Sequence, residues 1–159
     1  MKKFISLVLS AAMLLGCAPA AFAASEASDS VIEQVIRSAE IMAGDGSGNM
    51  NLDRTVTRAE YAKMLVCAST YKDQVSGASN SSPFKDVPYT HWAAGYIKTA
   101  VQQGWLSGYL DGSYKPTRTV TLEEAATGVL KLLGYSTADF SGSYPYGQLA
   151  LYQSLSLNS

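Results

Sequence analysis

The chain contains one segment twice. Residues 44–62 and residues 108–126 align without a gap at a constant offset of 64 positions. The identical pairs are Gly44/Gly108, Gly48/Gly112, Arg54/Arg118, Thr55/Thr119, Val56/Val120, Thr57/Thr121, Glu60/Glu124 and Ala62/Ala126. A unit this short cannot bury its own apolar face, so we expect the copies to pack on one another.

The second copy carries a long string of characteristic residues. In order these are F-K-D-V at 84–87, His91, Trp92, G-Y-L-D-G at 108–112, Tyr114, Pro116 and V-T at 120–121. The first copy supplies T-R-A-E at 57–60. This order resembles the repeat of the S-layer homology (SLH) family. The first copy lacks the F-x-D-V and Trp elements, and the second has Leu122 where the family has the Arg of T-R-A-E.

The resemblance implies a fold and a domain organisation. We expect a mainly α fold of helix–loop–helix SLH repeats, packed as a pseudo-three-fold spindle whose third repeat is incomplete. The expected segments are 1–23 for a signal peptide, 24–75 for repeat 1, 76–83 for a linker, 84–135 for repeat 2 and 136–159 for the start of repeat 3.

Local patterns predict five helices. Ser30 and Glu33 form an S-x-x-E capping box, and the apolar stripe behind them predicts a helix over Val31–Ala43 that Gly44 ends. The T-x-x-E patterns predict helices that begin after Thr57 and Thr121. The remaining expectations are a helix from about Trp92 to Gln103 ended by Gly104, a helix end at Gly134, and Pro145 at the first position of a fifth helix.

The first residues resemble an export signal. Lys2 and Lys3 precede an apolar run over 4–15, and an A-x-A cleavage pattern follows at 21–23. We therefore expect a secreted protein. A second interpretation is a lipobox-like L-L-G-C ending at Cys17, which would carry a lipid. No later stretch is apolar enough to span a membrane, so we expect no membrane insertion after cleavage.

Composition argues against several functions. The formal net charge is −1 and there is no basic stripe, so we expect no nucleic acid partner. His91 is the single histidine and Cys67 the single expected mature thiol, so we expect no metal site, no cofactor and no enzyme. Acids and amides alternate over 45–53 as in a calcium loop. However, Met50 and Val56 stand where that loop needs Gly and Glu, so a Gly/Asn-rich turn is the better interpretation.

Arg58 stands at a position that capping does not explain. Thr57 and Glu60 have an adequate structural role as a capping box. A cation in the first turn opposes the helix dipole, whereas an anion bound at the helix N-terminus would make it favourable. The alternatives are a solvated Arg58, or a pair with Asp53 or Asp86. Because we expect no core contact from Arg58, its removal should leave the fold intact.

The resemblance also implies a function. SLH domains bind anionic cell-wall polysaccharides, often with pyruvate ketals, and thereby attach proteins to the bacterial cell wall without covalent bonds. We expect a secondary cell-wall polysaccharide as the partner and a cell-surface location. The expected polysaccharide-binding residues are Arg58, Thr57, Glu60, Asp45, Gly108, Asp111, Gly112 and Trp92. For Trp92, packing in the repeat core is the more ordinary role.

Two other functions stay open at this point. The chain could be the N-terminal targeting module of a larger cell-wall enzyme or surface protein. It could also be a protein-binding repeat domain that has lost polymer affinity. Leu122 favours the second alternative, because it cannot do the work of an Arg, and we expect the second copy to bind more weakly than the first.

Overall fold

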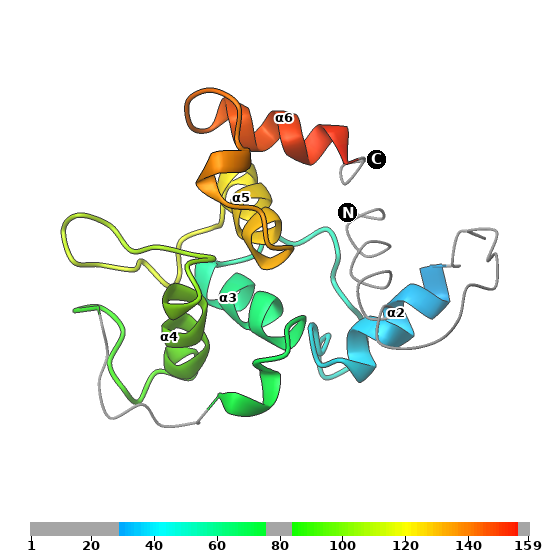
Figure 1. The fold of residues 1–159 in the computed structure, drawn as a ribbon. Coiled ribbons are helices and arrows are strands. Elements are labelled where there is room, and N and C mark those ends of the chain that lie inside the picture. The colour runs from blue at the N-terminus through cyan, green and yellow to red at the C-terminus, as the bar shows by residue number, and fades with distance from the viewer. Residues whose placement is uncertain (1–28, 76–83, 156–159) are drawn as a thin grey trace.

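The protein is described by a computed structural model that covers residues 29–75 and 84–155 (Figure 1). Its helices are α2 (Asp29–Ser38), α3 (Arg58–Cys67), α4 (Ala94–Gln102), α5 (Leu122–Leu132) and α6 (Tyr146–Ser154), with short 3₁₀ helices η1 (Lys72–Gln74) and η2 (Thr137–Asp139). The expected mainly α fold is confirmed. The pseudo-three-fold packing stays a prediction, and the expected signal peptide and linker lie outside the described residues.

The starts of α3 and α5 are set by the predicted capping boxes. The Thr57 hydroxyl accepts from the Glu60 amide, and the Glu60 carboxylate accepts from the Thr57 amide at 2.8 Å. Thr121 and Glu124 repeat the arrangement, with 3.0 Å between the Thr121 amide and the carboxylate. Both predictions are confirmed. They could be made from the sequence because a capping box depends on residues only three positions apart.

The other helix starts differ from prediction by one or two residues. α2 begins at Asp29, which places Ser30 inside its first turn instead of before it. α4 begins two residues after Trp92, and the ring Nδ1 of His91 accepts from the Ala93 amide at 3.1 Å just before it. Pro145 immediately precedes α6 instead of occupying its first position.

Helix ends depend on residues in the left-handed conformation. Gly104 and Gly134 end α4 and α5 as predicted, with φ angles of 74° and 92°. The prediction for α2 is wrong, because the helix ends at Ser38 and not at Gly44. Glu40 takes φ 58° and donates to the Arg37 carbonyl, while the Ile41 amide donates to Ile36, which is the hydrogen-bond pattern of a Schellman end.

The two glycine loops share most of their backbone conformation. The Asp45 amide donates to the Asn49 carbonyl at 2.8 Å, and the Tyr109 amide donates to the Ser113 carbonyl, 64 positions later, at 2.8 Å. The pairs with positive φ also correspond, as Gly48 with Gly112 and Asn51 with Lys115. The loops differ at their first glycine, because Gly44 has φ 72° and Gly108 is not in the left-handed region. Sequence identity at a few positions has therefore preserved the turn over 45–51 and 109–115.

The second loop packs on the first turn of α3. The Arg58 and Ala59 amides donate to the carbonyls of Arg118 and Pro116, at 2.8 and 3.0 Å. The Val120 amide donates to the Val56 carbonyl at 2.9 Å beside an isolated antiparallel bridge between Thr57 and Thr119. The free amides at the start of a helix need acceptors, and here the neighbouring repeat supplies them.

The F-x-D-V motif holds this second loop in place. The Asp86 carboxylate accepts from the amides of Tyr114 and Lys115, at 2.8 and 2.7 Å. Phe84 lies so close to Gly108 that a Cβ there would meet its ring at 2.0 Å. Gly108 is therefore required by packing, and Asp86 does not pair with Arg58.

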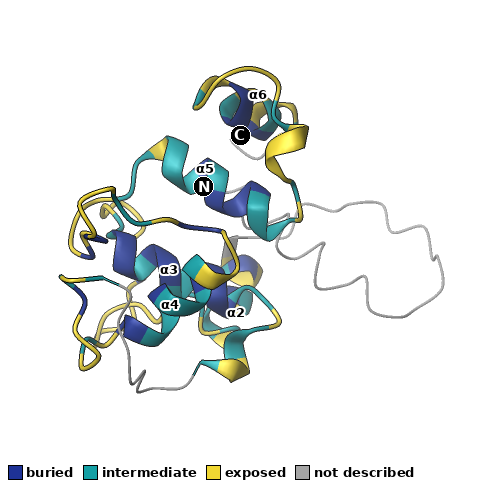
Figure 2. Ribbon diagram, turned by 60° about the vertical axis from the view of Figure 1, so that its left-hand side comes forward, coloured by how far each residue is buried: buried dark blue, intermediate teal, exposed yellow. Residues whose placement is uncertain are grey.

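The main core is shared between repeats. α3 packs against α4 and α5, and α5 packs against α6 (Figure 1). In Figure 2 the buried positions of α3, α4 and α5 lie where these helices come together. The packed pairs α3–α4 and α5–α6 each join the last helix of one sequence repeat to the first helix of the next. The structural unit is therefore shifted by one helix from the sequence unit.

α2 belongs to a smaller, separate cluster. Ile32 and Ile36 bury their side chains with Met50 of the first glycine loop, and Ile41 and Met42 pack around them. The Arg37 guanidinium donates to the carbonyls of Ala43 and Gly48, which ties α2 to the loop that follows it.

Candidate functional site

Two grooves on the surface are built from matching parts of the repeats. Groove 1 has a volume of about 340 Å³ and groove 2 of about 410 Å³. Groove 1 is lined by Ile41, Met42, Ala43, Gly44, Asp45, Met50, Asn51, Arg54, Val56, Glu60, Lys63, Met64 and Trp92. Groove 2 is lined by Arg58, Trp105, Leu106, Ser107, Gly108, Tyr109, Glu124, Thr127, Lys131, Thr137, Phe140, Tyr144 and Gln148.

The two linings correspond in part. Residues 41–45 of groove 1 become residues 105–109 of groove 2 at the offset of 64, and Glu60 becomes Glu124. Each groove also has an aromatic residue two positions before the next helix: Trp92 before α4 and Tyr144 before α6. The grooves therefore form at the packed pairs α3–α4 and α5–α6.

Trp92 lies on the surface and not in the core. Its side chain is 57% exposed and Tyr144 is 58% exposed, so both present a ring to solvent within a groove. The expected core packing of Trp92 is wrong. The buried indole is that of Trp105, whose ring meets Tyr71 edge-on with centroids 5.9 Å apart. Trp105 follows the helix-ending Gly104 directly, and this position could have indicated its burial.

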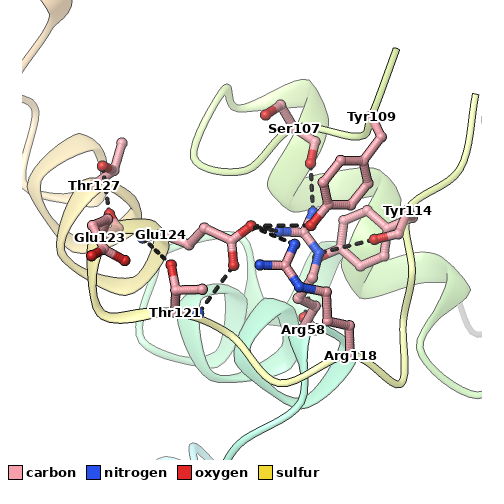
Figure 3. A network of polar contacts seen from close by, with 9 residues as sticks. All are labelled: Arg58, Ser107, Tyr109, Tyr114, Arg118, Thr121, Glu123, Glu124 and Thr127. Carbon is pink, nitrogen blue, oxygen red and sulfur yellow. Dashed lines mark hydrogen bonds and ion pairs between the residues drawn. The ribbon is translucent and has the colours of Figure 1, made fainter. Parts of the chain in front are cut away.

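Arg58 is buried at the junction of the repeats, with 3% of its surface exposed. Its guanidinium donates to the Glu124 carboxylate at 2.6 Å, to the Tyr114 carbonyl at 2.9 Å and to the Ser107 carbonyl at 2.6 Å (Figure 3). It also lies over the ring of Tyr109, 5.0 Å from the centroid. The expectations of a solvated Arg58, or of a pair with Asp53 or Asp86, are therefore wrong.

The chain itself supplies an anion at the start of α3. Glu124 belongs to the first turn of α5, and its carboxylate offsets the unfavourable position of the Arg58 cation. The expectation that Arg58 makes no core contact is therefore wrong. Because removing Arg58 would leave the Glu124 carboxylate and two carbonyls without this donor, we now predict that its removal destabilises the fold. Arg58 still lines groove 2, where it forms part of the floor.

The capping carboxylates of the two grooves have different cation partners. Glu60 forms a two-pronged pair with Arg54, with contacts of 2.9 and 3.1 Å. Arg54 is the main cause that lowers the pKa of Glu60. Glu124 instead takes Arg58 at 2.6 Å, and Arg118, the counterpart of Arg54, reaches it only at 3.5 Å.

The other predicted binding residues divide between the grooves and the loop surfaces. Asp45 lines groove 1 and Gly108 lines groove 2, whereas neither Asp111 nor Gly112 is among the described residues that line groove 2. The Asp111 carboxylate accepts from the amide and hydroxyl of Ser113, which lowers its pKa.

The Asp45 carboxylate is occupied by its own loop. It accepts from the Asn51 side chain and from the amides of Asn49 and Ser47, and these bonds lower its pKa. Over residues 29–75 and 84–155, no group of three or more acidic, His or Cys side chains is placed to hold a metal ion. The loop is thus organised as the expected Asn-rich turn.

Comparison with known proteins decides the family. Residues 24–62 and 83–126, more than half of the chain, match the S-layer homology domain. The chain belongs to the S-layer homology family. This SLH chain is 34% identical over 167 residues to the middle cell wall protein of Brevibacillus brevis, covering 99% of the chain and 16% of that protein. It is 34% identical over 143 residues to the surface layer protein of Brevibacillus choshinensis, covering 85% of the chain and 13% of that protein.

A third relative is named for an anchoring role. The cellulosome-anchoring protein of Acetivibrio thermocellus is 33% identical over 95 residues, which cover 60% of the SLH chain and 21% of that protein. The chain thus spans less than a quarter of each of these relatives. The expected location at the bacterial cell surface agrees with the family. None of the helices in the described ranges is long and apolar enough to cross a membrane.

Proposed function

We propose that this SLH module attaches a protein to the bacterial cell wall without covalent bonds, by binding an anionic secondary cell-wall polysaccharide in grooves 1 and 2. The observation that carries the proposal is the repeated construction of the grooves. Each joins a glycine loop, a capping Glu and an exposed aromatic ring at equivalent positions. A polymer of repeating sugars is a suitable partner for two similar grooves on one chain.

The aromatic rings give the grooves a means to hold a sugar. Trp92 and Tyr144 each combine a large apolar face with a polar edge, and both are more than half exposed. Sugar rings present an apolar face for such stacking and hydroxyls for hydrogen bonds. Asn51 at groove 1 and Gln148 at groove 2 carry side-chain amides that can meet those hydroxyls.

The other residues expected from the sequence act in this proposal through the shape and charge of the grooves. Thr57 and Glu60 hold the start of α3, and Gly108 lets the loop approach Phe84. Asp111 and Gly112 shape the turn beside groove 2. Arg58 adds positive charge to its floor, which favours an acidic group such as a pyruvate ketal.

Sedimentation with cell walls tests the proposal. The full chain should co-sediment with native walls of Brevibacillus choshinensis and stay in solution with walls stripped of their secondary polysaccharide. Trp92→Ala and Tyr144→Ala should each weaken co-sedimentation, while Tyr89→Ala, an exposed aromatic residue outside both grooves, should not. Equal binding to native and stripped walls would show that the polysaccharide is not the ligand. It would favour a protein-binding repeat domain.

A second candidate is the targeting module of a larger cell-wall enzyme. The observation in its favour is a relative from Bacillus anthracis named as an uncharacterised cell wall amidase, 36% identical over 90 residues that cover 57% of this chain and 16% of that protein. Fusing the chain to a wall amidase of unrelated origin should raise hydrolysis of native walls more than of stripped walls. An equal rate on both substrates would contradict the targeting role.

A further inference from the structure

Two arginines at equivalent positions are used differently. Arg54 and Arg118 are identical residues of the repeated segment, and each faces the capping Glu of its own repeat. Arg54 holds Glu60 through both nitrogens, whereas Arg118 touches Glu124 through one nitrogen at 3.5 Å. A pair at that distance is at the limit of a hydrogen bond.

Arg58 is the cause of the difference. The Glu124 carboxylate already accepts from Arg58 at 2.6 Å, from the Tyr109 hydroxyl at 3.2 Å and from the Thr121 amide at 3.0 Å (Figure 3). These donors satisfy it without Arg118. The Arg118 guanidinium therefore lies beside the ring of Tyr109, 5.5 Å from the centroid, with 40% of its side chain exposed.

We propose that Arg118 is the residue that contacts the acidic group of the ligand in groove 2, and that Arg58 is its positioning residue. Arg58 occupies Glu124 and so leaves Arg118 able to turn toward an anion. Tyr109 and Glu124, the two residues that Arg118 touches, both line groove 2. The inference rests on the proposed function and names the specificity-determining contact within it.

The charges of the two linings favour an acidic ligand in groove 2 more than in groove 1. The charged lining of groove 1 consists of Arg54 and Lys63 against Asp45 and Glu60, which sum to zero. The charged lining of groove 2 consists of Arg58 and Lys131 against Glu124, which sum to +1. Beside the lining, Arg118 and Lys115 lie over Tyr109, and Glu123 acts on Tyr144. An acidic sugar entering groove 2 meets an excess of positive charge, and one entering groove 1 does not.

Arg118 is also easier to move away from its Glu than Arg54 is. Moving Arg118 away from Glu124 breaks one long contact of a carboxylate that keeps three other donors. Moving Arg54 away from Glu60 breaks two short contacts and removes the cation that lowers the pKa of that carboxyl. Arg54 is thus held by its own repeat, and it serves as the matched control for Arg118.

The test compares binding of full-length variants to purified secondary polysaccharide from Brevibacillus choshinensis walls. Two forms of the polymer are used: native, and with its carboxylates converted to amides by a neutral primary amine and a carbodiimide. Arg118→Ala should weaken binding to the native polymer about tenfold, as loss of a charge-assisted contact does, and should flatten its salt dependence. Arg54→Ala, a change in the lining of groove 1, should weaken binding less than Arg118→Ala does. Arg118→Lys should bind better than Arg118→Ala because the charge remains.

Every outcome decides between the proposals. If the parent binds the native polymer and Arg118→Ala binds it equally well, the assignment of Arg118 is wrong while the proposed function stands. If both variants lose binding equally, the distinction between the grooves is wrong. If the parent binds native and amidated polymer alike, the ligand contact is not acidic, and the role of Arg118 fails. If the parent binds neither polymer, the proposed function fails, and this inference fails with it.

Discussion

Groove 1 and groove 2 have the same parts but different charges. Both have a capping Glu and an exposed aromatic residue, and in both repeats an Arg directly before the T-V-T segment contacts that Glu. In groove 1 the Glu is neutralised by an Arg of its own repeat, and in groove 2 by Arg58 of the preceding repeat. Both grooves nevertheless use residues of a neighbouring repeat, because the packed helix pairs span the boundary between sequence repeats. Groove 1 takes Trp92 from repeat 2, and groove 2 takes Arg58 from repeat 1.

The largest effect should come from Arg58→Ala. It breaks a buried ion pair and leaves the Glu124 carboxylate without its nearest donor, which costs about 3–5 kcal/mol of unfolding free energy. Urea denaturation followed by circular dichroism measures it. The matched change Arg54→Ala removes an exposed pair and should cost about 1 kcal/mol or less. Similar losses for the two variants would remove the distinction between the grooves.

A smaller effect should follow from Gly108→Ala. The added Cβ would overlap the ring of Phe84, and overpacking of this kind costs about 1–3 kcal/mol. The control is Gly46→Ala, which has open space around it in the first loop and should be nearly neutral. The midpoints of thermal unfolding compare the two. If Gly108→Ala is as stable as Gly46→Ala, the contact with Phe84 does not restrain the second loop.

The F-x-D-V carboxylate of Asp86, a motif that the first copy lacks, makes the stability of the second loop depend on pH. Burial raises the pKa of Asp86, but the amide donors Tyr114 and Lys115 outweigh it, so the net pKa is below the ordinary 3.8. A lowered folded pKa contributes stability above pH 3.8 that is lost as pH falls through the folded value.

Unfolding measured from pH 6 down to pH 2.5 should therefore show a decline below about pH 4 that Asp86→Asn makes shallower. At neutral pH this variant should lose about 1 kcal/mol, since one of the two amides keeps an acceptor. The pKa values of Glu60 and Asp45 are also lowered, so their contributions to stability are lost over a similar pH range. For this reason the parent and the variant are compared at every pH, and identical slopes would contradict the role of Asp86.

The smallest effect should come from Leu122→Arg. Leu122 occupies in α5 the position of Arg58 in α3, but its side chain is 63% exposed. Arg58 depends on carbonyls of the following loop, and no loop of the described residues lies over Leu122 in that way. We expect a change within about 0.5 kcal/mol in stability and no gain in polymer affinity. A clear gain would mean that the Arg of T-R-A-E acts alone, without its neighbouring loop.

Features that depend on near neighbours in the sequence were predictable. Thr57 with Glu60, and Thr121 with Glu124, are three positions apart, and the left-handed ends at Gly104 and Gly134 need only the preceding turn. The end of α2 escaped prediction because Glu40, a residue with no preference for positive φ, takes the place of a Gly.

The sequence by itself determined the repeat, the presence of the helices, the caps of α3 and α5 and the family, since these follow from local hydrogen bonding and from motif order. The tertiary structure alone decided that Arg58 is buried and that Trp92 is exposed. The partner of Arg58, Glu124, lies 66 positions away in the chain, and only the packing of one repeat on the next brings the two together. Two side chains at the same repeat position, Arg58 and Leu122, therefore differ in burial according to whether a neighbouring loop covers them.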